Sequence, residues 1–147
     1  MLSLRVTAAA FAALVLGACG PHATRVSTPQ GALDLDAFLA AHRLPDEGGI
    51  RADQIGRTDG ASYHIVQVHG GEKPHRHETH DLTVFVLRGH GVLTRPAGRT
   101  PLQEGDASVV PRGEPHWFAS EGAFPAISLV VFAPPLDAPD AVPVEQR

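Results

Sequence analysis

Three histidines in two short segments are the residues of this chain whose types and spacing are best suited to chemistry. His75 and His77 form a His-x-His pair, and His116 lies in a second segment further along. Neutral imidazole is the commonest protein metal ligand near neutral pH. Because side chains alternate along a strand, His75 and His77 would point to the same face. A third histidine from another strand would complete a three-nitrogen metal site inside a β-barrel.

The strands that must position these histidines are predicted between residues 49 and 133. Short apolar or alternating segments are separated there by glycine or proline at nearly every gap. Many short strands with regular turn signals are typical of an all-β sandwich or barrel. The expected strands are 49–55, 60–69, 74–78, 82–88, 91–95, 99–103, 106–110, 115–120 and 124–133.

One helix is expected, over residues 33–44, because apolar residues recur there at spacings near 3.6. Asp34 or Asp36 could cap its start, and Pro45 stops it. We expect this short helix to pack on the outside of the main body.

The two histidine segments resemble the two motifs of the cupin superfamily. The first motif of that family is Gly, five residues, His-x-His, three or four residues, Glu, six residues, Gly. The second is Gly, five residues, Pro-x-Gly, two residues, His, three residues, Asn. The positions that match are His75, His77 and Gly89 for the first motif, and Gly105, Pro111, Gly113 and His116 for the second, with Ser120 in place of Asn. The resemblance covers about residues 60–133 and implies an all-β fold, a single cupin jelly-roll barrel.

One departure from the family pattern concerns the fourth metal ligand. Counting back from Gly89, the family's metal-binding glutamate is replaced by Leu82, which cannot bind a metal. If the strand already runs from His80, parity puts His80 and Leu82 inside and Asp81 outside. A bulge at residues 79–81 would instead turn Asp81 inward. The fourth ligand is therefore His80, Asp81 or water, and of these we favour His80.

Nitrogen coordination of this kind suits a divalent transition metal such as Zn, Fe, Ni or Cu, and the missing carboxylate makes Mn a poorer fit. Fold does not settle function, since cupins include dioxygenases, isomerases and sugar-binding regulators. The leading hypothesis is a metal-binding protein. One alternative is a metal-dependent enzyme, dioxygenase-like or isomerase-like, acting on a small molecule. Another is a metal-free structural or ligand-binding barrel. The catalytic residues are unknown, because no acid, base or nucleophile stands out apart from the metal site.

The first residues predict a targeting segment. Arg5 precedes an uncharged apolar run over residues 8–15, which is too short to span a bilayer comfortably. The sequence Leu-Gly-Ala-Cys that ends at Cys19 resembles a bacterial lipobox, which implies cleavage before Cys19 and lipid attachment to its thiol. The expected location is the cell envelope, lipid-anchored on the periplasmic side. Gly20 after the cysteine slightly favours the outer membrane.

Composition limits the partners that can be expected. Cleavage would remove Arg5 from the 12 basic residues, which leaves 11 against 16 acidic ones and a formal charge of −5. That balance argues against a nucleic-acid partner, which needs a basic face. A single cysteine excludes a disulfide within the chain. A small-molecule ligand is the expected partner, and a homodimer is suggested only by analogy with other cupins.

The predicted organisation is a single domain with peripheral segments. The signal peptide occupies residues 1–18, a flexible tether 19–31, the barrel 32–133 and a disordered proline-rich tail 134–147.

Overall fold

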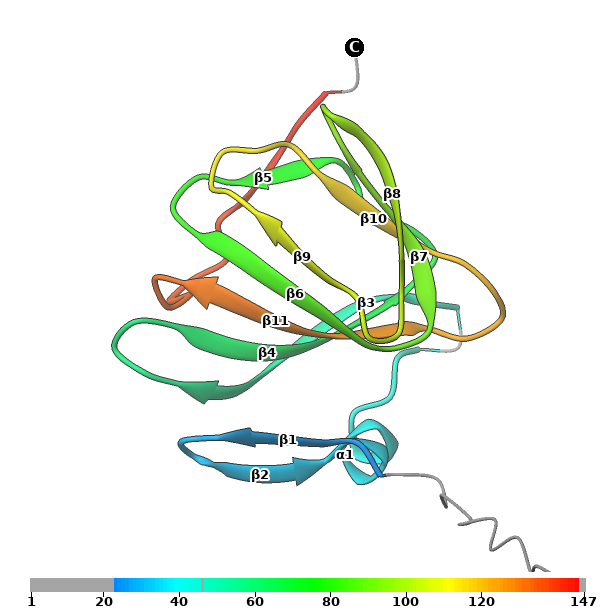
Figure 1. The fold of residues 1–147 in the computed structure, drawn as a ribbon, viewed down its shortest axis with the longest axis vertical. Helices are drawn as coiled ribbons and strands as arrows, with labels where there is room; N and C mark the ends of the chain where they lie inside the picture. The colour runs from blue at the N-terminus through cyan, green and yellow to red at the C-terminus, as the bar shows by residue number, and fades with distance from the viewer. Residues whose placement is uncertain (1–22, 46, 146–147) are drawn as a thin grey trace, which may run out of the picture.

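The computed structural model describes residues 23–45 and 47–145, so the expected signal peptide and Cys19 lie outside the described residues. The described part is built of strands with one short helix, which confirms the all-β prediction (Figure 1). No helix within it is long and apolar enough to cross a membrane.

A five-stranded antiparallel sheet forms one layer of the barrel. Its strand order is β3-β4-β11-β6-β9. The bounds are β3 Gly49–Arg57, β4 Ser62–His69, β11 Ala126–Ala133, β6 Asp81–Arg88 and β9 Ala107–Val110.

Two smaller sheets form the facing layer, and they meet at the histidine segments. One has the order β10-β7-β8 and the other pairs β12 with β5. Isolated bridges between Gly71 and Ala119 and between His75 and His116 join the β5 region to the β10 region. The bounds are β10 Trp117–Ser120, β7 His90–Arg95, β8 Gly98–Gln103, β12 Ala141–Pro143 and β5 His75–His77. All nine strands expected between residues 49 and 133 are confirmed, each within two residues at either end.

Alternation along the central strands divides the apolar residues into two clusters, one on each face of the large sheet. The inner cluster faces the β10-β7-β8 sheet, and its buried members are Leu82, Val86, Leu93, Leu102, Val110, Val130 and Phe132. The outer cluster lies on the opposite face, and its buried members are Val26, Leu35, Ile65 and Ile127.

Helix α1 (Leu35–Ala41) covers the outer cluster, as expected for a helix outside the barrel. Asp34 is the N-cap, and its Oδ1 accepts a hydrogen bond from the Ala37 amide at 3.1 Å. The helix ends earlier than residue 44. Its C-cap is His42, whose carbonyl accepts a hydrogen bond from the Gln67 side chain at 2.6 Å instead of continuing the helix.

The segment expected to be a flexible tether is instead partly a hairpin. Strands β1 (Arg25–Thr28) and β2 (Gly31–Asp34) pair with each other and lie beside α1 below the barrel in Figure 1. Val26 is 7% exposed and belongs to the outer cluster. The segment is rich in turn-forming residues, so its composition predicted a flexible tether. Val26 is the single valine that packs the hairpin into the outer cluster, and one residue is too weak a signal to recognise in the sequence.

The tail after residue 133 also differs from the expected disorder. Its strand β12 pairs with β5, so the tail returns across the barrel beside His75 and His77. Leu136 packs against the inner cluster, and its amide donates to Ser62 Oγ at 3.0 Å. We call residues 134–145 the strap. Its composition alone predicted disorder, because it offers few apolar side chains to bury. The pairing with β5 and the packing of Leu136 offset the conformational entropy that is lost when the strap is ordered.

Candidate metal centre and ligand cavity

Direct backbone pairing positions the three histidines. The amide of His75 donates to the His116 carbonyl at 3.1 Å, and the amide of His116 donates to the His75 carbonyl at 2.8 Å. The turn before His116 is held to β5, because the Gly113 amide donates to the His77 carbonyl at 2.7 Å. Gly113 has a φ of +80°, a conformation that favours glycine. The turn residues of the second motif therefore set His116 opposite the His-x-His pair.

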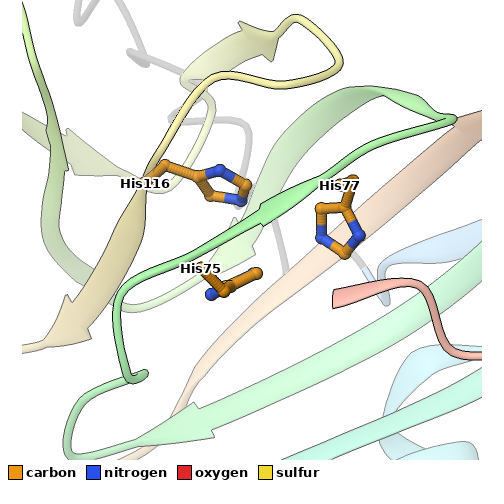
Figure 2. A group of neighbouring side chains, drawn as sticks. All are labelled: His75, His77 and His116. Carbon is orange, nitrogen blue, oxygen red and sulfur yellow. The ribbon is translucent and has the colours of Figure 1, made fainter. Parts of the chain in front are cut away.

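The structure brings the three predicted histidines together (Figure 2). One ring nitrogen from each of His75, His77 and His116 lies within 4.8 Å of the other two. The ring centroids of His75 are 4.5 Å from His116 and 5.1 Å from His77, and those of His77 and His116 are 5.5 Å apart. His77 and His116 are buried.

Each of the three rings uses its Nδ1 atom to reach a fixed acceptor. His75 Nδ1 contacts the Lys73 carbonyl at 2.8 Å, and His116 Nδ1 contacts the Glu114 carbonyl at 3.0 Å. A carbonyl only accepts, so both Nδ1 atoms carry the proton. His77 Nδ1 lies 2.6 Å from Asp140 Oδ1, a carboxylate that likewise accepts. Each ring, when neutral, then has its lone pair on Nε2.

Burial favours the neutral form of two of these rings. It lowers the pKa of His77, although the hydrogen bond to Asp140 opposes the shift. Burial also lowers the pKa of His116, to about 4. Both imidazoles are therefore unprotonated on one nitrogen at neutral pH, as a metal ligand must be.

These donors fit a transition-metal ion. One ring nitrogen of each histidine lies within 4.8 Å of the other two, and because each Nδ1 faces an acceptor, Nε2 is the nitrogen left to bind a cation between the rings. Acceptors for the second ring nitrogen are what metal-binding histidines ordinarily have, since they fix the tautomer and the ring orientation. Three protein nitrogens leave coordination positions for water or a ligand. His75, His77 and His116 are the residues that would hold the ion.

His80 and Asp81, the two protein candidates for a fourth ligand, are not part of this group. His80 is buried, but its Nδ1 contacts Asp140 Oδ2 and its Nε2 lies 3.3 Å from the Pro135 carbonyl. Asp81 points outward, as strand parity predicts, and forms an exposed ion pair with Arg112 at 2.8 Å. The Arg112 side chain lowers the pKa of Asp81 to about 2. The preference for His80 as fourth ligand is thus not supported, because the strap holds this ring.

Leu82 occupies the inner face where the family's glutamate would lie. It is 5% exposed and pairs across β6 and β11 with Phe132, whose ring centroid is 5.4 Å from that of His77. The described structure therefore places hydrocarbon at this side of the histidines.

Asp140 is a site residue that sequence reasoning missed. Its Oδ1 accepts from His77, and its Oδ2 accepts from His80 and from Thr79 Oγ1, the last at 3.1 Å. Burial opposes ionisation, but the hydrogen bonds from His77 and His80 prevail and lower its pKa to about 2. Asp140 lies in the proline-rich tail, and no spacing relative to the histidine motifs pointed to it.

Glu72 is a second residue that sequence reasoning missed. Its amide donates to the Phe118 carbonyl at 2.8 Å, and its Oε2 accepts from the Phe118 amide at 2.8 Å. Burial raises the pKa of Glu72, with the Phe118 amide and His75 acting in the opposite direction. The carboxyl group lines the same cavity as the three histidines.

A cavity of about 820 Å³ occupies the interior of the barrel and reaches the histidines. All the buried inner-cluster residues line it, so this core surrounds a hollow. His64 on β4 also lines the cavity; its Nε2 lies 2.9 Å from Ser62 Oγ, and burial lowers its pKa. Ligand pockets ordinarily measure roughly 300–1,000 Å³, so the hollow has the size of a small-molecule site.

Comparison with known proteins agrees with the fold. A family model described as Cupin domain matches residues 62–132. An uncharacterized protein of Aquifex aeolicus is 33% identical over 96 residues, which are 65% of this chain and 78% of that protein.

Solved structures share the same architecture. The protein TT1209 from Thermus thermophilus is 28% identical, with a TM-score of 0.61 over 71% of this chain and 97% of that chain. A double-stranded β-helix protein from Klebsiella pneumoniae gives a TM-score of 0.61 at 21% identity, over 74% of this chain and 95% of that chain. With its two histidine motifs joined at a hollow jelly-roll barrel, this chain belongs to the cupin superfamily.

Proposed function

We propose that this protein is an exported, lipid-anchored cupin that binds a divalent transition metal through His75, His77 and His116 and presents it to a small molecule. The observation that carries the proposal is the common orientation of the three rings. Each Nδ1 faces an acceptor outside the cluster, which leaves the three Nε2 atoms for one ion.

The metal-free barrel explains this arrangement less well. Histidines that only line a polar pocket have no need to hold the same nitrogen of all three rings away from the centre. Burial also keeps His77 and His116 neutral, and neutral lone pairs in proximity favour a shared cation.

A metal-dependent enzyme is the second candidate, and the position of Glu72 favours it. Zn, Fe, Ni or Cu bound by three nitrogens would supply Lewis-acid chemistry, or for Fe and Cu redox chemistry, at its open positions. Glu72 places a carboxyl group of raised pKa in the same cavity, where it could hold a proton beside a bound molecule. Oxygen uptake by anaerobically Fe-loaded protein, with small phenolic and carbonyl compounds, tests this candidate. Glu72→Gln should lower turnover while leaving metal content unchanged.

Export and lipid attachment rest on the lipobox-like sequence that ends at Cys19. Mass spectrometry of the protein from a bacterial host should show a lipid-modified N-terminal cysteine, and Cys19→Ser should abolish both the modification and membrane fractionation. An unmodified, soluble wild-type chain would contradict the proposal.

A homodimer is also proposed, supported by exposed Phe85 and Val109 on adjacent strands β6 and β9, and light scattering tests it.

Titration with individual metals tests the central proposal. The chelator-treated protein should bind one Zn²⁺, Ni²⁺ or Cu²⁺ ion per chain, and its melting temperature should rise with metal concentration, because an ion bound only by the native state stabilises it. His75→Ala and His116→Ala should each lose both effects. Metal binding that is unchanged in these variants would overturn the proposal.

A further inference from the structure

The wall of the cavity is hydrocarbon from both layers of the barrel. Leu82, Val84, Val86 and Val130 contribute from the large sheet, and Leu93 and Leu102 contribute from the facing sheet. A fully packed core would place side chains in this space. Here the apolar side chains of the core face a hollow of about 820 Å³.

Most polar side chains along the cavity either lie at its histidine end or already have a partner. Glu72 and Lys73 precede His75 on the segment that leads into β5, and both line the cavity. Away from that end, His64 is paired with Ser62, and Gln54 is exposed on β3. The Ser128 hydroxyl remains as a single polar group within the wall of β11.

This distribution of polar groups indicates the chemistry of the ligand's body, which is the part that would lie in the cavity away from the histidines. Burying a hydroxyl group without a hydrogen-bond partner is unfavourable, and a sugar or another polyol would bring several hydroxyl groups into a wall that offers few partners. An apolar body loses nothing in the same place and removes its surface from water.

The charge of the site indicates the chemistry of the ligand's head, which is the group that would contact the metal. A ligating imidazole carries no charge, so His75, His77 and His116 would leave the charge of a divalent ion uncompensated, and Leu82 supplies no carboxylate where other cupins have one. Both oxygens of nearby Asp140 are engaged by His77 and His80. An anionic oxygen donor would complete such a coordination shell.

We infer that the ligand is a small amphipathic molecule with an apolar body in the hollow barrel and one anionic, oxygen-donating head on the metal. This inference rests on the proposed metal site. It names a class of substrate or ligand that neither the fold nor the histidines specify by themselves.

Three hydroxamates with the same metal-binding head test the inference. The full-length Zn²⁺-loaded protein is titrated calorimetrically with octanohydroxamate, acetohydroxamate and gluconohydroxamate, and with 1-octanol as a probe that lacks the head. Octanohydroxamate should bind at least about a hundredfold more tightly than the other two hydroxamates, since each buried methylene contributes roughly 0.8 kcal/mol. Equal affinities, or tightest binding of gluconohydroxamate, would overturn the apolar body. Octanol binding as tightly as octanohydroxamate would overturn the anionic head.

Two substitutions on β6 test whether the tighter binding of octanohydroxamate arises in the cavity. Val84→Phe adds a ring on the cavity side and should remove most of the preference for octanohydroxamate. Thr83→Phe adds the same ring to a neighbouring residue that does not line the cavity and should keep the preference. A preference that survives Val84→Phe would contradict the inference. If Val84→Phe does not fold, the comparison of the three hydroxamates on wild-type protein decides alone.

The same titrations separate this inference from the proposed function. Failure of the wild-type protein to bind Zn²⁺ in the loading step would overturn the metal site. Zn²⁺ binding without a dependence on the body of the hydroxamate would leave the metal site standing and overturn only the ligand class.

Discussion

The two faces of the large sheet carry apolar clusters of opposite character. On the outer face, Leu35 of α1 packs in one cluster with Ile65 of β4 and Val26 of the β1–β2 hairpin, and both Leu35 and Ile65 are 0% exposed. On the inner face, a cluster with more buried members surrounds a cavity of about 820 Å³ that ends at three histidines. The same strands serve both faces, because their side chains alternate.

This difference in packing indicates that the outer face of the sheet contributes to stability and the inner face contributes to ligand binding. The outer cluster is packed against a helix that touches no part of the cavity, so its role is to hold the sheet. The inner cluster contributes less packing than its composition would allow, and that deficit leaves room for a ligand. Substitutions on the two faces should therefore have different consequences.

The largest expected effect is on the outer face. Leu35→Ala should lower the free energy of unfolding by about 2–5 kcal/mol, since it opens a void among packed atoms. Leu93→Ala makes the same change on the cavity wall, where it enlarges an existing hollow, and should cost less than half as much. Urea denaturation of both variants gives the comparison, and equal losses would mean that the inner cluster is as tightly packed as the outer one.

The next effect concerns the strap. Asp140→Asn weakens the acceptor of His77 and should reduce Zn²⁺ affinity by roughly 10–100-fold, the usual result of losing a partner of a ligating histidine. Asp137→Asn is a matched control on the strap, because Asp137 pairs with Arg57 and not with a histidine. Calorimetry on both variants should show the loss only for Asp140→Asn. Wild-type affinity in that variant would argue against a positioning role.

A smaller effect is expected from restoring the family's carboxylate. Leu82→Glu places an acid on the inner face beside the histidines and should raise Mn²⁺ affinity by about tenfold, since a hard carboxylate favours that ion. Leu82→Met keeps the volume without the charge and should leave Mn²⁺ affinity as it is. No gain in Leu82→Glu would show that this position does not reach the ion.

The smallest effect is a pH dependence on the inner face. Burial lowers the pKa of His64, so the folded ring stays neutral while the unfolded one takes up a proton below about pH 6.5. The unfolded state then binds more protons, and the free energy of unfolding should fall as the pH drops through that range. His64→Gln should lose less stability than wild type between pH 7.5 and pH 5.5 in chelator-treated protein. Parallel pH profiles would indicate that His64 is protonated equally in both states.

The sequence was sufficient for the features that depend on local patterns. Turn residues and alternation predicted the barrel strands, Asp34 was one of two proposed helix caps, and regular strand parity was the one of two alternatives that placed Asp81 outside and Leu82 inside. These features follow from the period of two and from turn chemistry, which neighbouring residues alone determine.

The features that depend on distant contacts could not be predicted. The strap has the composition of a disordered tail, and only its pairing with β5 reveals that Asp140 reaches His77. For the same reason, strand parity offered His80 as a candidate ligand but could not show that Asp140 and Pro135 contact its two nitrogens. The cavity inside the inner cluster could not be predicted from the sequence either, because apolar residues alternate along a strand in the same way whether they pack against each other or face a ligand.

The metal content of the protein is the decisive test of the three-histidine site. The full-length wild-type protein and a His75/His77/His116 triple-alanine variant are expressed in their native compartment and measured by elemental analysis, with His42→Ala on the outer side as the control. We expect about one divalent transition-metal ion per chain in wild type and in the control, and almost none in the triple variant. Equal metal content in the wild-type protein and the triple variant would contradict it.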